Sequence, residues 1–166
     1  DRFSIWAPNS TLWQVIALGG QLAGGVLVPL NTRYKQTEVK DILIRSKSQA
    51  VFHIESFLGT NYSAMLAGLD NIETVSLVPI STLDDWAGAG ETISDIELDQ
   101  RIGQVTPTSL ADILFTSGTT GLPKGVMCSH GQNIRVFQTW AAGVTLSSDD
   151  EYLIVNPYFH SFGYKA

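Results

Sequence analysis

The sequence has little cysteine, little charge and few basic residues, and each shortage excludes a class of protein. One cysteine among 166 residues, Cys128, cannot build a disulfide framework or a cysteine-based zinc site within the chain. Lysine and arginine number 10 against 16 acidic residues, which leaves a net charge of −6. Nucleic-acid binders have a basic face and polybasic membrane anchors cluster lysine and arginine, so the composition argues against both. The lone cysteine fits a reducing, cytoplasmic setting.

Charge is absent from one long stretch, residues 3–32, so a membrane-spanning helix is the first alternative to consider. About 20 mainly apolar residues suffice to cross a bilayer. Prolines and two glycine pairs interrupt the stretch. It is therefore interpreted as a strand at 3–7, a buried helix at 10–23 and a second strand at 26–28, with no transmembrane segment.

Apolar strands and amphipathic helices then alternate along the chain. Helices are expected at 36–46 and 56–69, and strands at 50–54 and 72–78. Strands that alternate with helices form β-α-β units, which need an at least partly parallel sheet covered by helices. The predicted fold class is therefore α/β.

Residues 79–108 differ from the rest in composition. Six of the sixteen acidic residues lie between Ser81 and Gln100. The segment is expected to be a solvated surface excursion. The alternative is a metal site built from Asp84, Asp85 or Asp95, although no spacing among them defines a coordination geometry.

Regular structure is expected to return after this excursion. The pattern predicts strands at 111–115, 126–128 and 152–155. A helix is expected up to residue 142, with Ser129 and Gln132 forming a capping box at its start. This helix is expected to turn three side chains inward: Val136, Phe137 and Trp140.

The segment between the strands at 111–115 and 126–128 has an unusual composition. Its first six residues are all threonine, serine or glycine: Thr116, Ser117, Gly118, Thr119, Thr120 and Gly121. Glycine lets the backbone approach a ligand closely, and successive free N–H groups form an anion-binding concavity. Hydroxyl groups add donors without charge, and Lys124 adds a mobile positive charge. The combination suits a polyphosphate.

Two other interpretations of this segment fit less well. A Walker A loop needs Gly-x-x-x-x-Gly-Lys followed by Ser or Thr, but Pro123 and Gly125 stand at two of the required positions. A strand rather than a helix is also expected after Lys124. A flexible linker of this composition rarely joins two short apolar strands.

Three parts of the chain resemble the adenylate-forming superfamily, which includes acyl-CoA synthetases, peptide-synthetase adenylation domains and luciferases. Residues 112–126 resemble the family signature, and residues 156–163 resemble its Pro-x-Phe-His-x-x-Gly segment. Trp6–Asn9 and Val28–Asn31 resemble its early β-α-β region. The resemblance covers essentially the whole chain.

The resemblance implies that residues 1–166 are part of the large N-terminal AMP-binding domain of such an enzyme. Within it, 1–78 would form β-α-β units, 79–108 the acidic excursion, and 109–166 the phosphate-loop and histidine-motif region. The motifs that the family carries further downstream are absent from this sequence. We therefore expect a piece of a longer protein, inactive by itself.

Members of the family join a carboxylate to AMP, and a thiol, usually that of CoA, then attacks the acyl-adenylate. The resemblance thus implies a small carboxylic acid, ATP, Mg²⁺ and CoA as ligands. It implies that Lys124 neutralises charge on the departing phosphates and that Thr116 contacts the ATP-bound magnesium. The residues that would cradle the phosphates are Thr116, Ser117, Gly118, Thr119, Thr120 and Gly121.

The three histidines are interpreted separately. The family histidine that matches His160 borders the acid substrate, so the resemblance makes His160 a pocket residue, whereas a buried structural histidine is the alternative. His53 and His130 are expected to be structural, and a metal site built from all three histidines is disfavoured.

The branch of the family stays open at this point. Leu30–Tyr34 and Asn156–Lys165 resemble acyl-CoA synthetases, above all those acting on propanoate side chains of degraded steroid rings. Medium- and long-chain fatty acids are the close alternatives, and an amino acid is another. Outside this class, the chain would be an ATP-binding regulatory module or a non-catalytic remnant. The oligomeric state is not predicted.

Overall fold

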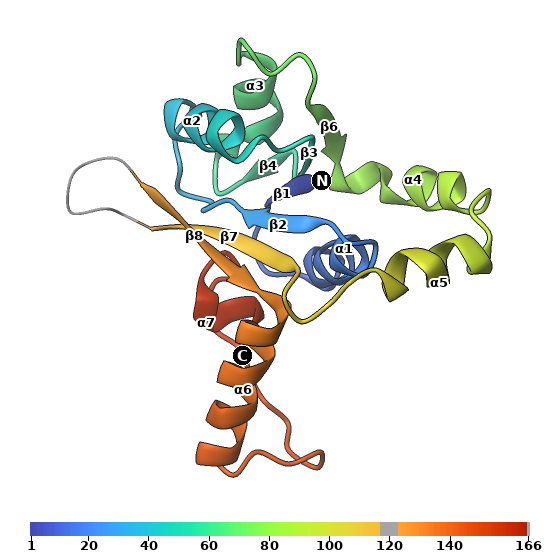
Figure 1. Cartoon of the computed structure of the whole chain (residues 1–166). Coiled ribbons are helices and arrows are strands. Elements are labelled where there is room, and N and C mark those ends of the chain that lie inside the picture. Colours follow the sequence, from blue (N-terminus) through green and yellow to red (C-terminus); the bar gives the residue numbers. More distant parts are fainter. Residues whose placement is uncertain (117–122, 166) are drawn as a thin grey trace.

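The computed structural model describes residues 1–116 and 123–165, within which six strands form one sheet in the order β6-β3-β1-β2-β7-β8 (Figure 1). These strands are β1 (Arg2–Trp6), β2 (Val26–Pro29), β3 (Ala50–His53), β6 (Ser76–Pro79), β7 (Leu110–Thr116) and β8 (Lys124–Ser129). Neighbours from β6 to β7 are parallel, and β8 is antiparallel to β7. The predicted partly parallel α/β sheet is confirmed.

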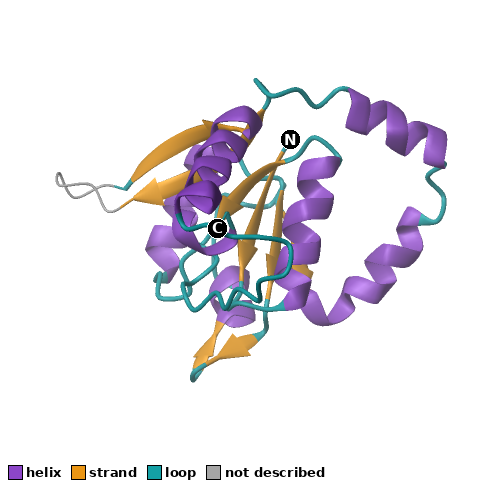
Figure 2. Cartoon of the chain, turned by 90° about the horizontal axis from the view of Figure 1, so that it is seen from below, coloured by secondary structure: helices purple, strands orange, loops and turns teal. Residues whose placement is uncertain are grey.

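Helices cover both faces of the sheet (Figure 2). The helices are α1 (Thr11–Leu22), α2 (Gln36–Ser46), α3 (Tyr62–Ala67), α4 (Leu83–Gly90), α5 (Asp95–Gly103), α6 (His130–Gly143) and α7 (Ser161–Tyr164), with a 3-10 helix, η1 (Ile80–Thr82). A separate hairpin consists of β4 (Ser56–Phe57) and β5 (Thr60–Asn61).

The alternation of side chains along β1 decides which helix covers which face, because successive residues of a strand point to opposite sides. Phe3 and Ile5 join Trp13 of α1 in one buried cluster. Trp6, from the other side of the strand, joins a second cluster with residues of α2 and α3, including Ile42. Burial of these apolar side chains on both faces is the main favourable term in the stability of such a fold.

The helix predicted over residues 56–69 is wrong in its first part. Residues 56–61 form the β4-β5 hairpin, whose turn has Leu58 and Gly59 at positive φ, values of 48° and 78°. A helix cannot continue through such residues. It begins only after Asn61, whose side-chain oxygen accepts a hydrogen bond from the Ala64 N–H at 2.8 Å.

Three further expectations need correction. The strand predicted at 72–78 begins only at Ser76. The strand predicted at 152–155 does not form: no strand within the described residues pairs with this short run, and Leu153 and Val155 are exposed. On α6, Val136 points to solvent rather than inward, while Phe137 and Trp140 are half-buried.

Residues 79–108 contain helices that their composition did not indicate. Both α4 and α5 are amphipathic, and the Ser94 hydroxyl caps α5 by accepting from the Glu97 N–H. Both helices lie beside the sheet (Figures 1 and 2), where Trp86 packs against Phe52 with ring centroids 5.4 Å apart. Most of their side chains are exposed.

The charge-free stretch 3–32 divides into β1, α1 and β2 as predicted. The Ser10 hydroxyl caps α1 by accepting from the Trp13 N–H at 3.1 Å. No helix in the described part of the chain has the length and apolar character to cross a membrane.

We expect Leu27→Ala to lower the free energy of unfolding by about 2–5 kcal/mol, because it leaves a cavity in the central strand. Leu27 is fully buried, whereas Leu58 is 87% exposed, so Leu58→Ala is the matched control. The control should change the free energy of unfolding by less than about 0.5 kcal/mol. Urea unfolding followed by circular dichroism measures both. Equal effects would show that β2 is not in the core.

Candidate functional site

The connections of β1 and β2 leave the sheet on opposite faces. Helix α1, which follows β1, packs in one core cluster, and α2, which follows β2, packs in the other. In an open parallel sheet this reversal opens a crevice at the carboxyl ends of the two strands, where ligands commonly bind.

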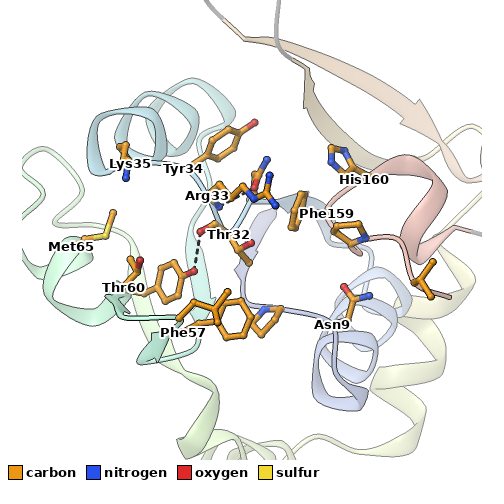
Figure 3. Close-up of a pocket in the computed structure, with 16 residues that line it drawn as sticks. Asn9, Thr32, Arg33, Tyr34, Lys35, Phe57, Thr60, Met65, Phe159 and His160 are labelled. Carbon is orange, nitrogen blue, oxygen red and sulfur yellow. Dashed lines mark hydrogen bonds between the residues drawn. The ribbon is translucent and has the colours of Figure 1, made fainter.

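A cavity of about 580 Å³ occupies this position (Figure 3). One wall comes from Pro8 and Asn9 after β1, and another from residues 31–35 after β2. The β4-β5 hairpin and α3 form a third wall, which includes the apolar side chains of Phe57 and Met65. Residues of the 155–160 segment close the cavity on the side away from the β4-β5 hairpin and α3.

Hydrogen bonds to the main chain hold the loop after β2 in place. The Trp6 indole N–H donates to the Asn31 carbonyl at 3.0 Å, and the Tyr62 hydroxyl donates to the Thr32 carbonyl at 2.9 Å. The Asn31 side-chain oxygen accepts from the Arg33 N–H at 2.9 Å. Burial raises the pKa of Tyr62 above its ordinary value, so the hydroxyl keeps its proton and remains a donor.

The charged side chains that line the cavity are cationic. Arg33 and Lys35 come from the loop after β2, and no aspartate or glutamate in the described part of the chain lines the cavity. The nearby Glu38 carboxylate instead accepts the Lys35 backbone N–H at 2.7 Å, at the start of α2. Burial, and then the charge of Glu38, raise the pKa of Tyr34. A cavity with this charge favours an anionic ligand.

His160 lines the same cavity as Arg33 and Lys35, so the structure places this sequence-predicted pocket residue in the cavity (Figure 3). It stands immediately before α7, and its ring packs on Phe159 with centroids 4.8 Å apart. The His160 side chain is exposed to the cavity rather than buried in the core.

Amide side chains from the first helix region fasten the beginning of this wall. The Asn9 amide donates to the Asn156 carbonyl at 2.9 Å, and its oxygen accepts from the Tyr158 N–H at 2.7 Å. The Gln14 amide donates to the Tyr158 hydroxyl at 2.9 Å. Residues almost 150 positions apart in the chain thus form one wall of the cavity.

The threonine-, serine- and glycine-rich segment joins β7 to β8. Thr116 ends β7 and is paired with Lys124, the first residue of β8, and both are exposed. The Thr116 hydroxyl donates to the Lys124 carbonyl at 3.5 Å. The prediction of a strand after Lys124 is confirmed. The remaining predicted phosphate-binding residues lie outside the described residues: Ser117, Gly118, Thr119, Thr120 and Gly121.

The cavity and this hairpin end are linked but distinct. The Tyr34 hydroxyl donates to the carbonyl of Phe115, the residue before Thr116, at 3.5 Å. Neither Thr116 nor Lys124 lines the cavity. The structure therefore brings His160 together with Arg33 and Lys35, and places the ends of the predicted phosphate loop beside them along the sheet.

The other two histidines lie elsewhere. His53 is buried at the end of β3, where its ring nitrogen is 3.2 Å from the Ile54 carbonyl oxygen, and His130 is the first residue of α6. Within residues 1–116 and 123–165, no group of three histidine, cysteine, aspartate or glutamate side chains could hold a metal ion.

Sequence reasoning missed Arg33 and Lys35 as cavity residues, and Asn9 as the anchor of the opposite wall. The sequence does contain a pattern that could have indicated them, because the polar and basic residues of 31–35 begin two residues after the end of the apolar strand β2. A carboxyl end of a parallel strand followed by polar and basic residues marks the ligand edge of an α/β sheet.

The fold is an α/β sheet with a cationic cavity at its carboxyl edge, and this edge lies beside the β7-β8 hairpin. The sequence profile of the AMP-binding enzyme family matches residues 1–166. The chain belongs to that family.

Two relatives are acyl-CoA ligases of one kind. One, from Rhodococcus jostii, is a 3-[(3aS,4S,7aS)-7a-methyl-1,5-dioxo-octahydro-1H-inden-4-yl]propanoyl:CoA ligase and is 41% identical to this chain. The match covers the whole of this chain and 35% of the relative's length. A ligase of the same name from Mycobacterium tuberculosis is 44% identical to this chain. The match covers the whole of this chain and 34% of the relative's length. The chain spans about a third of the length of these relatives.

Among solved structures, ATP-bound MatB from Rhodopseudomonas palustris matches 98% of this chain and 31% of its own, with a TM-score of 0.79 and 27% identity. The N-terminal domain of FACL13 from Mycobacterium tuberculosis matches 96% of this chain and 39% of its own, with a TM-score of 0.68 and 27% identity. The fold is that of the N-terminal part of adenylate-forming enzymes.

We expect Gly163→Ala to displace the His160 wall, the cavity wall formed by residues 155–160, because a Cβ at Gly163 would clash with the Pro157 carbonyl oxygen. The free energy of unfolding should fall by about 1–3 kcal/mol. The near-ultraviolet circular dichroism should also change, because the rings of Tyr158 and Tyr164 pack on Trp13 with centroids 5.2 and 5.4 Å away. Gly143→Ala is the control, since a Cβ there meets no atom within 4 Å. An unchanged spectrum for Gly163→Ala would contradict the tight packing.

Proposed function

We propose that the full-length protein containing this chain joins a carboxylic acid to AMP and then transfers the acyl group to CoA. The chain would supply the phosphate-binding hairpin and part of the acid site. The observation that carries the proposal is the cavity at the carboxyl edge of β1 and β2, which Arg33, Lys35 and His160 line together beside the end of β7. Membership of the AMP-binding enzyme family supports it.

The chemistry explains why such a site needs positive charge. A carboxylate is a poor acyl donor because its leaving group would be oxide or hydroxide. When a carboxylate oxygen attacks the α-phosphorus of ATP, the bond to the β-phosphate oxygen breaks and pyrophosphate leaves. Two anions must approach each other, and charge builds up on the departing phosphates. Fixed cations and hydrogen-bond donors lower the barrier to such a step.

The proposed assignment of residues follows from this need. Lys124 would neutralise charge on the departing phosphates, and the hydroxyls and N–H groups of 116–121 would bind them. Lys124 and Thr116 are exposed at adjacent positions on the two strands, so both are accessible to a polyphosphate. Arg33 and Lys35 would attract the anionic substrates into the cavity, and His160 would border the acid.

The residues present are compatible with Mg²⁺ brought in on ATP. Magnesium keeps several waters and takes few protein ligands besides the substrate phosphates. The exposed Thr116 hydroxyl is one oxygen donor at the expected place. When bound, Mg²⁺ would neutralise phosphate charge, and Thr116 would help to orient it.

The acid is proposed to be a bicyclic propanoate derived from a steroid ring system. The two ligases named for such an acid are 41% and 44% identical to this chain, whereas a long-chain-fatty-acid–CoA ligase, FadD13, is 31% identical. Apolar side chains in the cavity, including Phe57, Met65 and Phe159, would contact its hydrocarbon part. The cytoplasm, which supplies both ATP and CoA, is the proposed compartment.

The test is pyrophosphate exchange into ATP by the full-length protein, with Mg²⁺ and a panel of acids. The panel contains 3-[(3aS,4S,7aS)-7a-methyl-1,5-dioxo-octahydro-1H-inden-4-yl]propanoate, octanoate, palmitate and phenylalanine. We expect exchange with the bicyclic propanoate and a CoA thioester when CoA is added. Exchange with phenylalanine alone would indicate an amino-acid adenylation domain. Binding of ATP without exchange for any acid would indicate a regulatory module or a remnant.

We expect Lys124→Ala in the full-length protein to slow acid-dependent exchange about 10- to 100-fold, because a cation that stabilises the departing phosphates is lost. Lys124 is exposed, so the variant should fold normally. Lys40→Ala, which removes a half-buried lysine paired with the exposed Asp70, is the control and should exchange at the wild-type rate. Equal rates for both variants would remove Lys124 from the phosphate site.

A further inference from the structure

Strand β7 carries a carboxylate where a parallel sheet normally has an apolar residue. Asp112 is fully buried, and its neighbours Ala111 and Ile113 belong to the hydrophobic core. A carboxylate without water around it is costly unless charged or hydrogen-bonded partners surround it. The partners of Asp112 therefore indicate which parts of the structure must stay together.

Lys165 supplies the opposite charge. Its ammonium donates to one Asp112 carboxylate oxygen at 2.9 Å, and only 5% of the Lys165 side chain is exposed. The same ammonium donates to the Asn133 side-chain oxygen at 3.0 Å and lies 5.6 Å from the centre of the Tyr164 ring. The Asn133 amide in turn donates to the other oxygen of Asp112 at 2.6 Å.

Three separate parts of the chain meet at this carboxylate. Asp112 belongs to β7, Asn133 to α6, and Lys165 follows α7. Both carboxylate oxygens have partners, and the ammonium has two acceptors. A buried ion pair that is satisfied in this way need not add net stability over apolar residues, but it strongly disfavours arrangements that separate its members. The ion pair thus fixes where the end of α7 lies relative to β7 and α6.

The ion pair therefore also fixes the position of the His160 wall, which leads directly into α7. Asn9 holds residues 156 and 158 at the beginning of this wall, and Lys165 holds its end, five residues after His160. The buried Gly163 donates its N–H to the His160 carbonyl at 2.9 Å, so the turn between the two is tight. Asp112 is also four residues before Thr116 on the same strand.

We propose that the buried Asp112–Lys165 pair is a positioning device that fixes His160 in the acid site relative to the strand carrying the phosphate loop. Lys165 touches neither the cavity nor the hairpin end, so it acts through the wall that it fastens. This inference rests on the proposed function, because its effect is on use of the acid. Breaking the pair is predicted to displace His160 and to leave the charges that line the cavity unchanged.

The experiment compares Lys165→Met with the full-length wild type in pyrophosphate exchange with the bicyclic propanoate. Because a small misplacement of a positioned group is costly, we expect kcat/KM for the acid to fall about 10- to 100-fold, mainly through a higher KM for the acid. The KM for ATP should change by less than about twofold, since the phosphate-binding residues are untouched. Lys165→Arg, which keeps the charge, should recover most of the loss.

A purely structural role predicts another result: fewer folded molecules, hence a lower kcat, with both KM values unchanged. That result, or wild-type kcat/KM for the acid in folded Lys165→Met, would overturn the inference. If Lys165→Met does not fold, the double variant Asp112→Asn/Lys165→Met replaces it, because it leaves no buried charge. The double variant is expected to show the same fall in kcat/KM for the acid, and the same two results would overturn the inference. Lys40→Met, which breaks the exposed pair with Asp70, is the control and should behave as wild type. Absence of exchange in the wild type would contradict the proposed function instead.

Discussion

The cavity depends on one constraint, the burial of β1 and β2 on both faces. Phe3 and Ile5 need cover on one side of β1, and Trp6 needs it on the other. A single helix cannot cover both faces, so α1 and α2 pass on opposite sides of the sheet. The two loops that follow the strands are then separated at their shared carboxyl edge. The ligand edge is thus a consequence of how the apolar residues alternate in β1.

The walls of this edge are held mainly by bonds from side chains to the main chain rather than by ion pairs. Asn9, Asn31, Trp6 and Tyr62 each bond to backbone groups of a wall. Such a bond has a modest net worth of about 1 kcal/mol, but several bonds aimed at one loop leave it few alternative conformations. A site whose groups are already in place loses less on binding or reaction than one that must first be ordered. The buried Asp112 is the exception. Its ion pair with Lys165 is explained by the relative position of β7 and the His160 wall that it fixes, and not by a net gain in folding stability.

The sequence predicted the sheet, its parallel character, and helices α1, α2 and α6, because each has a clear apolar period and bounding caps or glycines. It did not predict the β4-β5 hairpin, where Leu58 occupies a positive φ that local preference disfavours. The strand expected at 152–155 also failed, because a four-residue apolar run forms a strand only where a partner is available. His160 was predicted as a cavity residue from its motif, whereas Arg33 and the Asp112–Lys165 pair depend on contacts between distant residues. No local pattern contains those contacts.

The net charge of −6 argues against binding of a nucleic acid, but it does not exclude binding of a small anionic ligand. Six acidic residues lie between Ser81 and Gln100, on α4, α5 and the turn between them, and both views place these helices on the other side of the sheet from the β7-β8 hairpin (Figures 1 and 2). Interactions between exposed charges are screened beyond about 10 Å at moderate ionic strength, so such acids weaken the local potential of a distant site little. A nucleic acid needs a basic face, but a single nucleotide needs only a few cations at one place. Arg33 and Lys35 supply two cations at one cavity in a chain that is acidic as a whole.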